Sequence, residues 1–189
     1  MIFKIKIILI LIQSQLILKS KGYDMQKIGI FYGSDGGTTQ EIAQKIANQI
    51  GNAQVFDVAS SKTSDLESFS NLILATPTYG SGDLQDDWDS FLSNINEGAF
   101  AGKTIALVGV GDQEIYGDTF CNGVAQIYHK ASKQGKIIGQ TATDGYTFDD
   151  SQAVVNGKFV GLVIDESNQQ ELTDERISKW IESIKTALA

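Results

Sequence analysis

Residues 33–39 (GSDGGTT) form the first stretch that could do chemistry, because they combine glycines with three hydroxyl side chains. They lie between a short apolar run and a segment with helical spacing, where free N–H groups and the helix dipole favour an anion. They lack the lysine of a nucleoside-triphosphate loop and the glycine spacing of a dinucleotide loop. A cradle for one phosphate monoester remains, formed by Ser34, Thr38, Thr39 and main-chain N–H groups. A glycine turn closed by a capping hydroxyl would have the same sequence pattern.

Two further loops each carry a tyrosine among glycines and carboxylates. Residues 77–84 (PTYGSGDL) contain Tyr79, and residues 111–118 (GDQEIYGD) contain Tyr116. Either tyrosine alone could be an ordinary packed residue. Two loop aromatics beside one phosphate cradle predict a planar ring held between them, because an aromatic sandwich desolvates both faces of a π system.

The elements that must position these loops alternate between strand and helix. Apolar runs predict strands at 27–32, 53–58, 71–76, 103–110, 136–138 and 159–164. Apolar residues at helical spacing predict helices at 38–50, 86–95, 118–134 and 173–188. This alternation predicts a parallel sheet with helices on both faces, whose ligand site lies beyond the carboxyl ends of the strands. The three loops occupy those ends.

Composition excludes several classes of site. Of the 189 residues, 42% are hydrophobic and 20% are charged, which excludes a disordered chain. The single cysteine, Cys121, and the single histidine, His129, exclude an internal disulfide, a thiolate metal cage and any site that needs two histidines. A formal net charge of −8 argues against nucleic acid as a partner, because nucleic-acid binding depends on phosphate neutralisation.

Residues 1–24 differ from the rest of the chain. They carry four lysines and one aspartate, whereas residues 25–189 hold 11 basic and 22 acidic side chains, a net charge of −11. Their aliphatic run is interrupted by Lys6 and by residues 13–15, so stable insertion into a membrane is not expected. We interpret them as a hydrophobic extension upstream of a start at Met25, or as a targeting segment, and residues 25–189 as one domain.

The sequence resembles a flavodoxin of the long-chain type over essentially all of residues 25–189. Residues 34–39 resemble the family's phosphate loop, residues 77–80 its first flavin loop, and residues 111–116 its second. Residues 143–162 resemble the insert in the fifth strand of long-chain members. Two positions depart from the family pattern: Gly36 stands where threonine is usual, and Tyr79 where many long-chain members have tryptophan.

The resemblance implies an α/β fold with a doubly wound, five-stranded parallel sheet in the order 2-1-3-4-5, and an FMN-binding domain over residues 25–189. It implies a protein that binds FMN non-covalently and carries single electrons between redox proteins, and is not an enzyme. The expected cofactor-binding residues are Ser34, Asp35, Gly36, Gly37, Thr38, Thr39, Pro77, Thr78, Tyr79, Gly80, Gly82, Gly111, Asp112, Tyr116 and Asp118.

The charge of these loops predicts a low reduction potential, because carboxylates without a nearby Lys or Arg oppose added electrons. The acidic body predicts partners with basic patches, of the flavodoxin or ferredoxin-NADP reductase type or other low-potential oxidoreductases. We expect a monomer in the cytoplasm.

The alternative function is an FMN-dependent NAD(P)H:quinone reductase on the same fold. It would need a nicotinamide site, and the insert has no group of basic residues for a dinucleotide phosphate. A signalling receiver is excluded, because the first and third predicted strands end at Tyr32 and Thr76 where that fold needs acidic residues.

Overall fold

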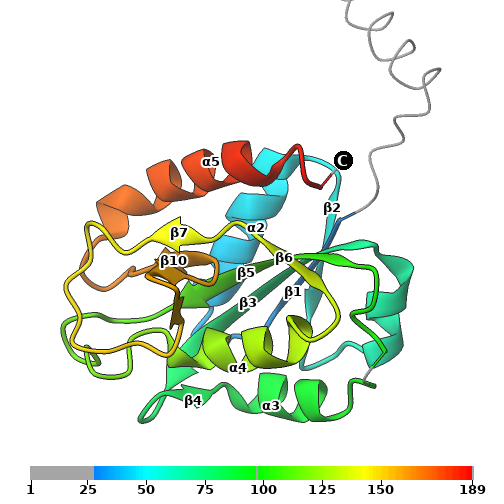
Figure 1. Ribbon diagram of the computed structural model, residues 1–189, viewed down its shortest axis with the longest axis horizontal. Helices are drawn as coiled ribbons and strands as arrows, with labels where there is room; N and C mark the ends of the chain where they lie inside the picture. Colours follow the sequence, from blue (N-terminus) through cyan, green and yellow to red (C-terminus); the bar gives the residue numbers. More distant parts are fainter. Residues whose placement is uncertain (1–27, 97, 189) are drawn as a thin grey trace, which may run out of the picture.

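A parallel sheet runs through the centre of the computed structural model, which describes residues 28–96 and 98–188 (Figure 1). From one edge its strands are β2 (Ala53–Asp57), β1 (Ile28–Tyr32), β3 (Asn71–Tyr79) and β5 (Thr104–Val110). Two short strands share the fifth place, since β6 (Lys136–Ile138) pairs with the first part of β5 and β10 (Leu162–Ile164) with its last part. The expected order 2-1-3-4-5, with an insert in the fifth strand, is confirmed.

The central strand β3 extends further than the sequence pattern predicted. An end at Thr76 was expected because Pro77 has no N–H to donate. Pro77 nevertheless stays in register beside Val110, and the next two residues pair antiparallel with β4 (Asp83–Leu84). Gly80 and Gly82, with φ of +52° and +99°, make the tight turn that brings β4 back.

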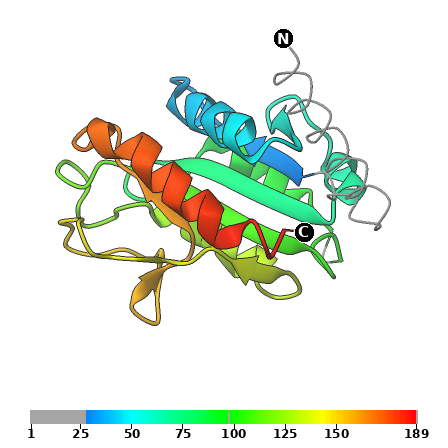
Figure 2. The same cartoon turned by 90° about the horizontal axis from the view of Figure 1, so that it is seen from above.

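In the described part of the chain, helices cover both faces of the sheet (Figures 1 and 2). Helices α2 (Thr38–Ile50) and α5 (Thr173–Ile184) lie side by side on one face, and α3 (Asp86–Ser93) and α4 (Asn122–Ala131) on the other. Their apolar stripes build two cores, one on each side of the sheet. Two short 3₁₀ helices, η1 (Thr63–Ser68) and η2 (Gln170–Leu172), lie in connecting segments. Trp88 and Trp180 are core residues, with 0% and 2% of their surface exposed.

The helix predicted at 118–134 is shorter than expected at both ends. It begins at Asn122 because Cys121 adopts a left-handed conformation, with φ of +58°, that a helix cannot include. Cys121 is buried, as expected for a small core residue, and His129 is exposed on α4. Helices α3 and α5 also end before the predicted residues 95 and 188.

The insert forms a small antiparallel sheet of its own, from β7 (Thr141–Ala142), β9 (Lys158–Phe159) and β8 (Val154–Val155). The strand predicted at 159–164 is therefore divided between β9 and β10. Aromatic rings at Tyr146, Phe148 and Phe159 pack around Phe120, which precedes α4. The insert thus supports the loop that links β5 to α4.

The N-terminal extension, residues 1–24, lies outside the described residues, as does Lys27 at the start of the first predicted strand. Within residues 28–96 and 98–188, no helix is both long and apolar enough to cross a membrane.

Candidate functional site

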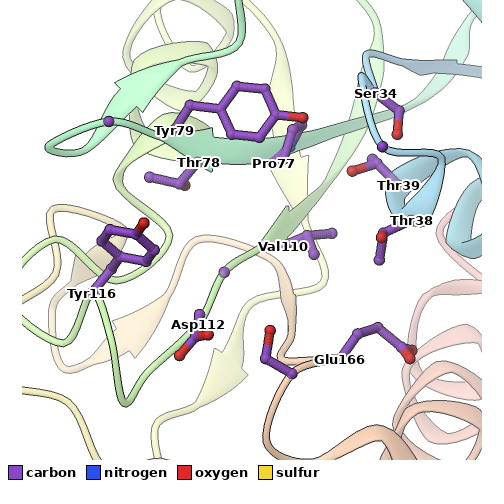
Figure 3. A pocket seen from close by; sticks show the side chains of 14 residues that line it. Ser34, Thr38, Thr39, Pro77, Thr78, Tyr79, Val110, Asp112, Tyr116 and Glu166 are labelled. Carbon is purple, nitrogen blue, oxygen red and sulfur yellow. The ribbon is translucent and has the colours of Figure 1, made fainter.

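A cavity of about 540 Å³ opens at the carboxyl ends of β1, β3, β5 and β10 (Figure 3). This volume lies within the usual range of small-molecule and cofactor sites, about 300–1,000 Å³. Its walls come from the three loops expected from the sequence and from a fourth loop that follows β10. The lining residues are Ser34, Gly36, Thr38, Thr39, Pro77, Thr78, Tyr79, Gly80, Val110, Gly111, Asp112, Tyr116, Glu166 and Ser167.

Four of the residues expected at the site do not line the cavity. The carboxylate of Asp35 points toward the start of α3, where it accepts from Gln85. The N–H of Gly37 donates to Ser34 Oγ at 3.0 Å, so both residues stabilise the first loop from outside the cavity. Gly82 packs against the start of α4, and Asp118 is exposed. The other expected residues come together around one cavity.

Three lining residues were not predicted from the sequence: Val110, Glu166 and Ser167. Val110 is the last residue of β5. Glu166 and Ser167 follow β10, which ends at the same edge of the sheet as the other strands. That shared edge was the signal for a fourth loop, because all carboxyl ends of a parallel sheet face the same site.

Hydroxyl groups gather at the end of the cavity formed by the N-terminus of α2. Ser34, Thr38 and Thr39 lie together on one side of the view in Figure 3. The first N–H groups of a helix have no acceptor within the helix, and they carry the positive end of its dipole. Gly37 directly precedes α2 and has a left-handed conformation, with φ of +90°. This end of the cavity is therefore built for an anion.

The position of Gly36 is open. A Cβ atom built there would meet no heavy atom within 4 Å, and its φ is outside the left-handed region. The loop consequently has room for a larger ligand or for a longer side chain at this residue.

Two tyrosines line the remainder of the cavity, as the sequence predicted. Tyr79 comes from the end of β3, and its phenol oxygen accepts a hydrogen bond from the backbone N–H of Asp35 at 3.2 Å. Tyr116 lies across the cavity from the hydroxyl groups and is 48% exposed (Figure 3). Its neighbour Ile115 is 72% exposed, so an apolar and aromatic pair stands at the mouth of the site.

The carboxylate of Asp112 accepts hydrogen bonds that stabilise the loop after β5. Its Oδ1 atom accepts from the N–H groups of Glu114 and Ile115, at 3.1 and 2.9 Å, and from Asn168 Nδ2 at 2.9 Å. Desolvation acts to raise the pKa of Asp112, but hydrogen bonds from Ile115, Asn168, Ser167 and Glu114 together lower the pKa below its ordinary value. Asp112 is therefore ionised at neutral pH.

A second carboxylate, that of Asp165, organises the fourth loop. Asp165 is completely buried, and it accepts from the backbone N–H groups of Gln113, Ser167 and Asn168. The amide of Asn168 also donates to both of its oxygens, at 3.1 and 2.9 Å. Asn168 Nδ2 thus joins Asp112 to Asp165, and so links the loops after β5 and β10.

The charge lining the cavity is negative. Asp112 and Glu166 contribute carboxylates, and none of the described residues that line the cavity is a lysine or an arginine. The Oε1 atom of Glu166 is buried, and no hydrogen-bond donor among the described residues reaches it. A ligand here would be held by hydroxyls, N–H groups and aromatic rings, with no cationic side chain among the described lining residues.

Comparison with known proteins gives the family. The sequence model of the flavodoxins matches residues 30–180. A flavodoxin of Helicobacter pylori is 56% identical over 165 residues, which cover 87% of this chain and all of that protein. A flavodoxin of a Nostoc species is 42% identical over 164 residues, covering 85% of this chain and 96% of that protein. The crystal structure of Fusobacterium nucleatum flavodoxin bound to flavin mononucleotide superposes with a TM-score of 0.80 at 38% identity, covering 86% of this chain and 98% of that one. The chain therefore belongs to the flavodoxin family.

Proposed function

We propose that this chain binds FMN non-covalently in the cavity and carries single electrons between redox partner proteins, as an electron-transfer protein and not an enzyme. The observation that carries the proposal is the pairing of an anion-binding end at the start of α2 with Tyr79 and Tyr116, in one cavity. The FMN bound by the Fusobacterium relative supports it, because that structure shares both the fold and 38% of the sequence.

The chemistry of the lining residues matches the two halves of FMN. Ser34, Thr38, Thr39 and the first N–H groups of α2 would hold the phosphate. Tyr79 and Tyr116 would hold the flavin ring, beside the backbone of 77–80 and 111–112. Asp35, Gly37, Gly82 and Asp118 would support these loops from outside the cavity. When bound, FMN supplies the one-electron chemistry.

The protein's own contribution is electrostatic. The carboxylates of Asp112 and Glu166 oppose the arrival of negative charge in the cavity, and no lining lysine or arginine offsets them. Partial exclusion of water keeps this Coulomb energy from being screened. We therefore propose a low reduction potential, suited to donating electrons to low-potential acceptors.

The partners follow from the same charge. Glu114 and Asp118 are exposed beside Ile115 and Tyr116 at the mouth of the site. This surface would suit reductases and other redox proteins with basic patches around a small apolar contact. We further propose that residues 25–189 form the FMN-binding domain, and that the protein acts as a monomer in the cytoplasm.

The alternative, an NAD(P)H:quinone reductase, is not favoured, because the similar proteins with 42% and 56% identity are flavodoxins. One experiment separates the two functions. The purified chain, loaded with FMN, is tested with NADPH in two mixtures. One contains a quinone, and the other contains cytochrome c with or without a basic flavoprotein reductase. The proposal expects transfer to cytochrome c only when the reductase is present. Steady NADPH oxidation with quinone alone would overturn it, as would a failure to bind FMN.

A further inference from the structure

Gln85 is a fully buried polar residue that lies behind the first loop of the candidate site. It precedes α3, and 0% of its surface is exposed. Its Oε1 atom accepts from the backbone N–H of Trp88 at 3.0 Å. Its Nε2 atom donates to Asp35 Oδ1 at 2.9 Å and to Asp87 Oδ2 at 2.7 Å. A buried amide with these three bonds is fixed in one orientation.

The same network holds the first loop at its beginning. A Cβ atom at Gly33 would lie 2.2 Å from Gln85 Oε1 and 2.6 Å from Trp88 Cδ1, so the backbone of Gly33 rests directly on these two side chains. The carbonyl of Ala75 in β3 accepts from Trp88 Nε1 at 2.7 Å and from the N–H of Gly33 at 3.2 Å. Gln85 and Trp88 therefore form a rigid support beneath residue 33.

Asp35 is held at two points. Gln85 binds its carboxylate, and Tyr79 accepts from its backbone N–H. As a result the carboxylate lies outside the cavity, although both neighbours of Asp35 in sequence line it. A freed Asp35 carboxylate could approach the anion-binding end of the cavity, where it would repel a phosphate.

Only a side-chain amide satisfies this position. The N–H of Trp88 needs an acceptor, while the carboxylates of Asp35 and Asp87 need donors. Glutamine offers an oxygen and an NH₂ group together, whereas ionised glutamate offers only acceptors and leucine offers neither. A third carboxylate at this point would face two others.

We propose that Gln85 is a positioning residue for phosphate recognition: by holding the Asp35 carboxylate, it fixes the 34–39 loop in its anion-binding form and keeps that negative charge out of the cavity. This inference rests on the proposed function, in which the loop binds the phosphate of FMN. It assigns Gln85 to the selection of FMN over riboflavin, which has the same ring without the phosphate.

The test compares dissociation constants for FMN and for riboflavin in the full chain, measured by quenching of flavin fluorescence. We expect Gln85→Leu to weaken FMN binding about tenfold, the usual scale for a hydrogen bond to a charged group, and to change riboflavin binding less than twofold. In an Asp35→Ala background the same substitution should have a smaller effect on FMN binding, because only the contact of Gln85 with Gly33 then remains. Asp87→Ala is the matched control: it removes the other carboxylate bound by Gln85 Nε2, and FMN selectivity should persist.

The possible results are distinct. Equal loss of FMN and riboflavin binding in Gln85→Leu would reduce Gln85 to a structural role and overturn the inference. So would an undiminished effect in the Asp35→Ala background. If circular dichroism shows that Gln85→Leu does not fold, Gln85→Glu replaces it, because glutamate keeps an acceptor for the N–H of Trp88 and replaces the donor to Asp35 with an oxygen that repels its carboxylate. If the unaltered chain binds no FMN, the proposed function itself has failed.

Discussion

The phenol oxygen of Tyr79 accepts a hydrogen bond from the backbone N–H of Asp35, at 3.2 Å. This bond spans 44 residues of sequence and joins the end of β3 to the loop before α2. The residue that offers an aromatic face to the cavity is thereby tied to the loop that offers the anion site. This exposed bond adds to the backbone bond from Gly33 to Ala75 in joining the two parts of the site.

Two substitutions at Tyr79 distinguish the contact of its ring with the flavin from its hydrogen bond to the first loop. We expect Tyr79→Ala to weaken the binding of both FMN and riboflavin, by about 1 kcal/mol or more, because both ligands share the ring that the tyrosine would contact. Tyr79→Phe keeps the aromatic face and should cost no more than about 1 kcal/mol, since an exposed neutral hydrogen bond contributes little. Titration of both variants with the two flavins measures this. A larger loss in Tyr79→Phe than in Tyr79→Ala would contradict an aromatic contact.

Gly36→Thr should tighten FMN binding. The space around Gly36 is open, and a threonine hydroxyl there would be a further donor to a charged acceptor, which contributes about 1.5 to 3 kcal/mol when well placed. Riboflavin binding should not change. Gly36→Val is the control, because it has the shape of threonine without the hydroxyl, and it should give no gain. If valine tightened FMN as much as threonine does, the benefit would come from a stiffer loop and not from the hydroxyl.

Asn168→Ala should destabilise the site in a pH-dependent way. The substitution removes one of the donors that lower the pKa of Asp112 and leaves Asp165 with fewer partners, so we expect a loss of about 1–3 kcal/mol at pH 7. A carboxylate with a depressed folded-state pKa stabilises the fold above its unfolded pKa, and this stability is lost as the pH falls through the folded pKa. The difference between the two proteins should therefore shrink below about pH 4.

Urea unfolding at pH 7 and at acidic pH tests this. Asn94→Ala provides the control, since the side chain of Asn94, at the end of α3, donates to the carbonyl of Ser90 at 2.8 Å. Its small cost should not vary with pH. A constant cost for Asn168→Ala over the whole range would mean that Asn168 does not act through the ionised carboxylate of Asp112.

Electron exchange with a basic reductase should slow as ionic strength rises. Residues 25–189 carry a net charge of −11, and attraction between oppositely charged surfaces accelerates encounter until salt screens it. Stopped-flow rates under second-order conditions, from low to near-molar salt, measure the effect. A rate that does not depend on salt would exclude electrostatic steering.

Most of the fold could be predicted from local sequence, because apolar periodicity decides each element separately. The exceptions depend on distant partners. β3 continues past Pro77 because β4 folds back to pair with it, and α4 begins late because Cys121 takes a left-handed conformation that its residue type does not announce. Neither the pairing with β4 nor the conformation of Cys121 can be predicted from the local apolar periodicity.

The site residues also fall into those that local sequence predicts and those that depend on distant partners. Glycines, hydroxyls and tyrosines identify three loops, since these residue types are unusual together after strands. Glu166 and Ser167 follow an ordinary short strand, and Gln85 is one polar residue in a polar segment. Gln85 matters through its burial and its hydrogen bond to Asp35, 50 residues away, and Glu166 and Ser167 reach the cavity because β10 pairs with β5. Sequence alone does not contain that information.

The division of the fifth strand into β6 and β10 affects local unfolding at this edge of the sheet. β6 and β10 each hold the sheet through only three residue pairs, whereas β3 and β5 share seven. The free energy needed for local unfolding is lowest where few backbone hydrogen bonds must break. Detachment of β10 would carry Asp165, Glu166 and Asn168 away from the cavity while β1 and β3 stay paired. We therefore expect the β10 edge of the sheet to open as a separate unit, and amide protons in β10 to exchange with solvent earlier than those in β3.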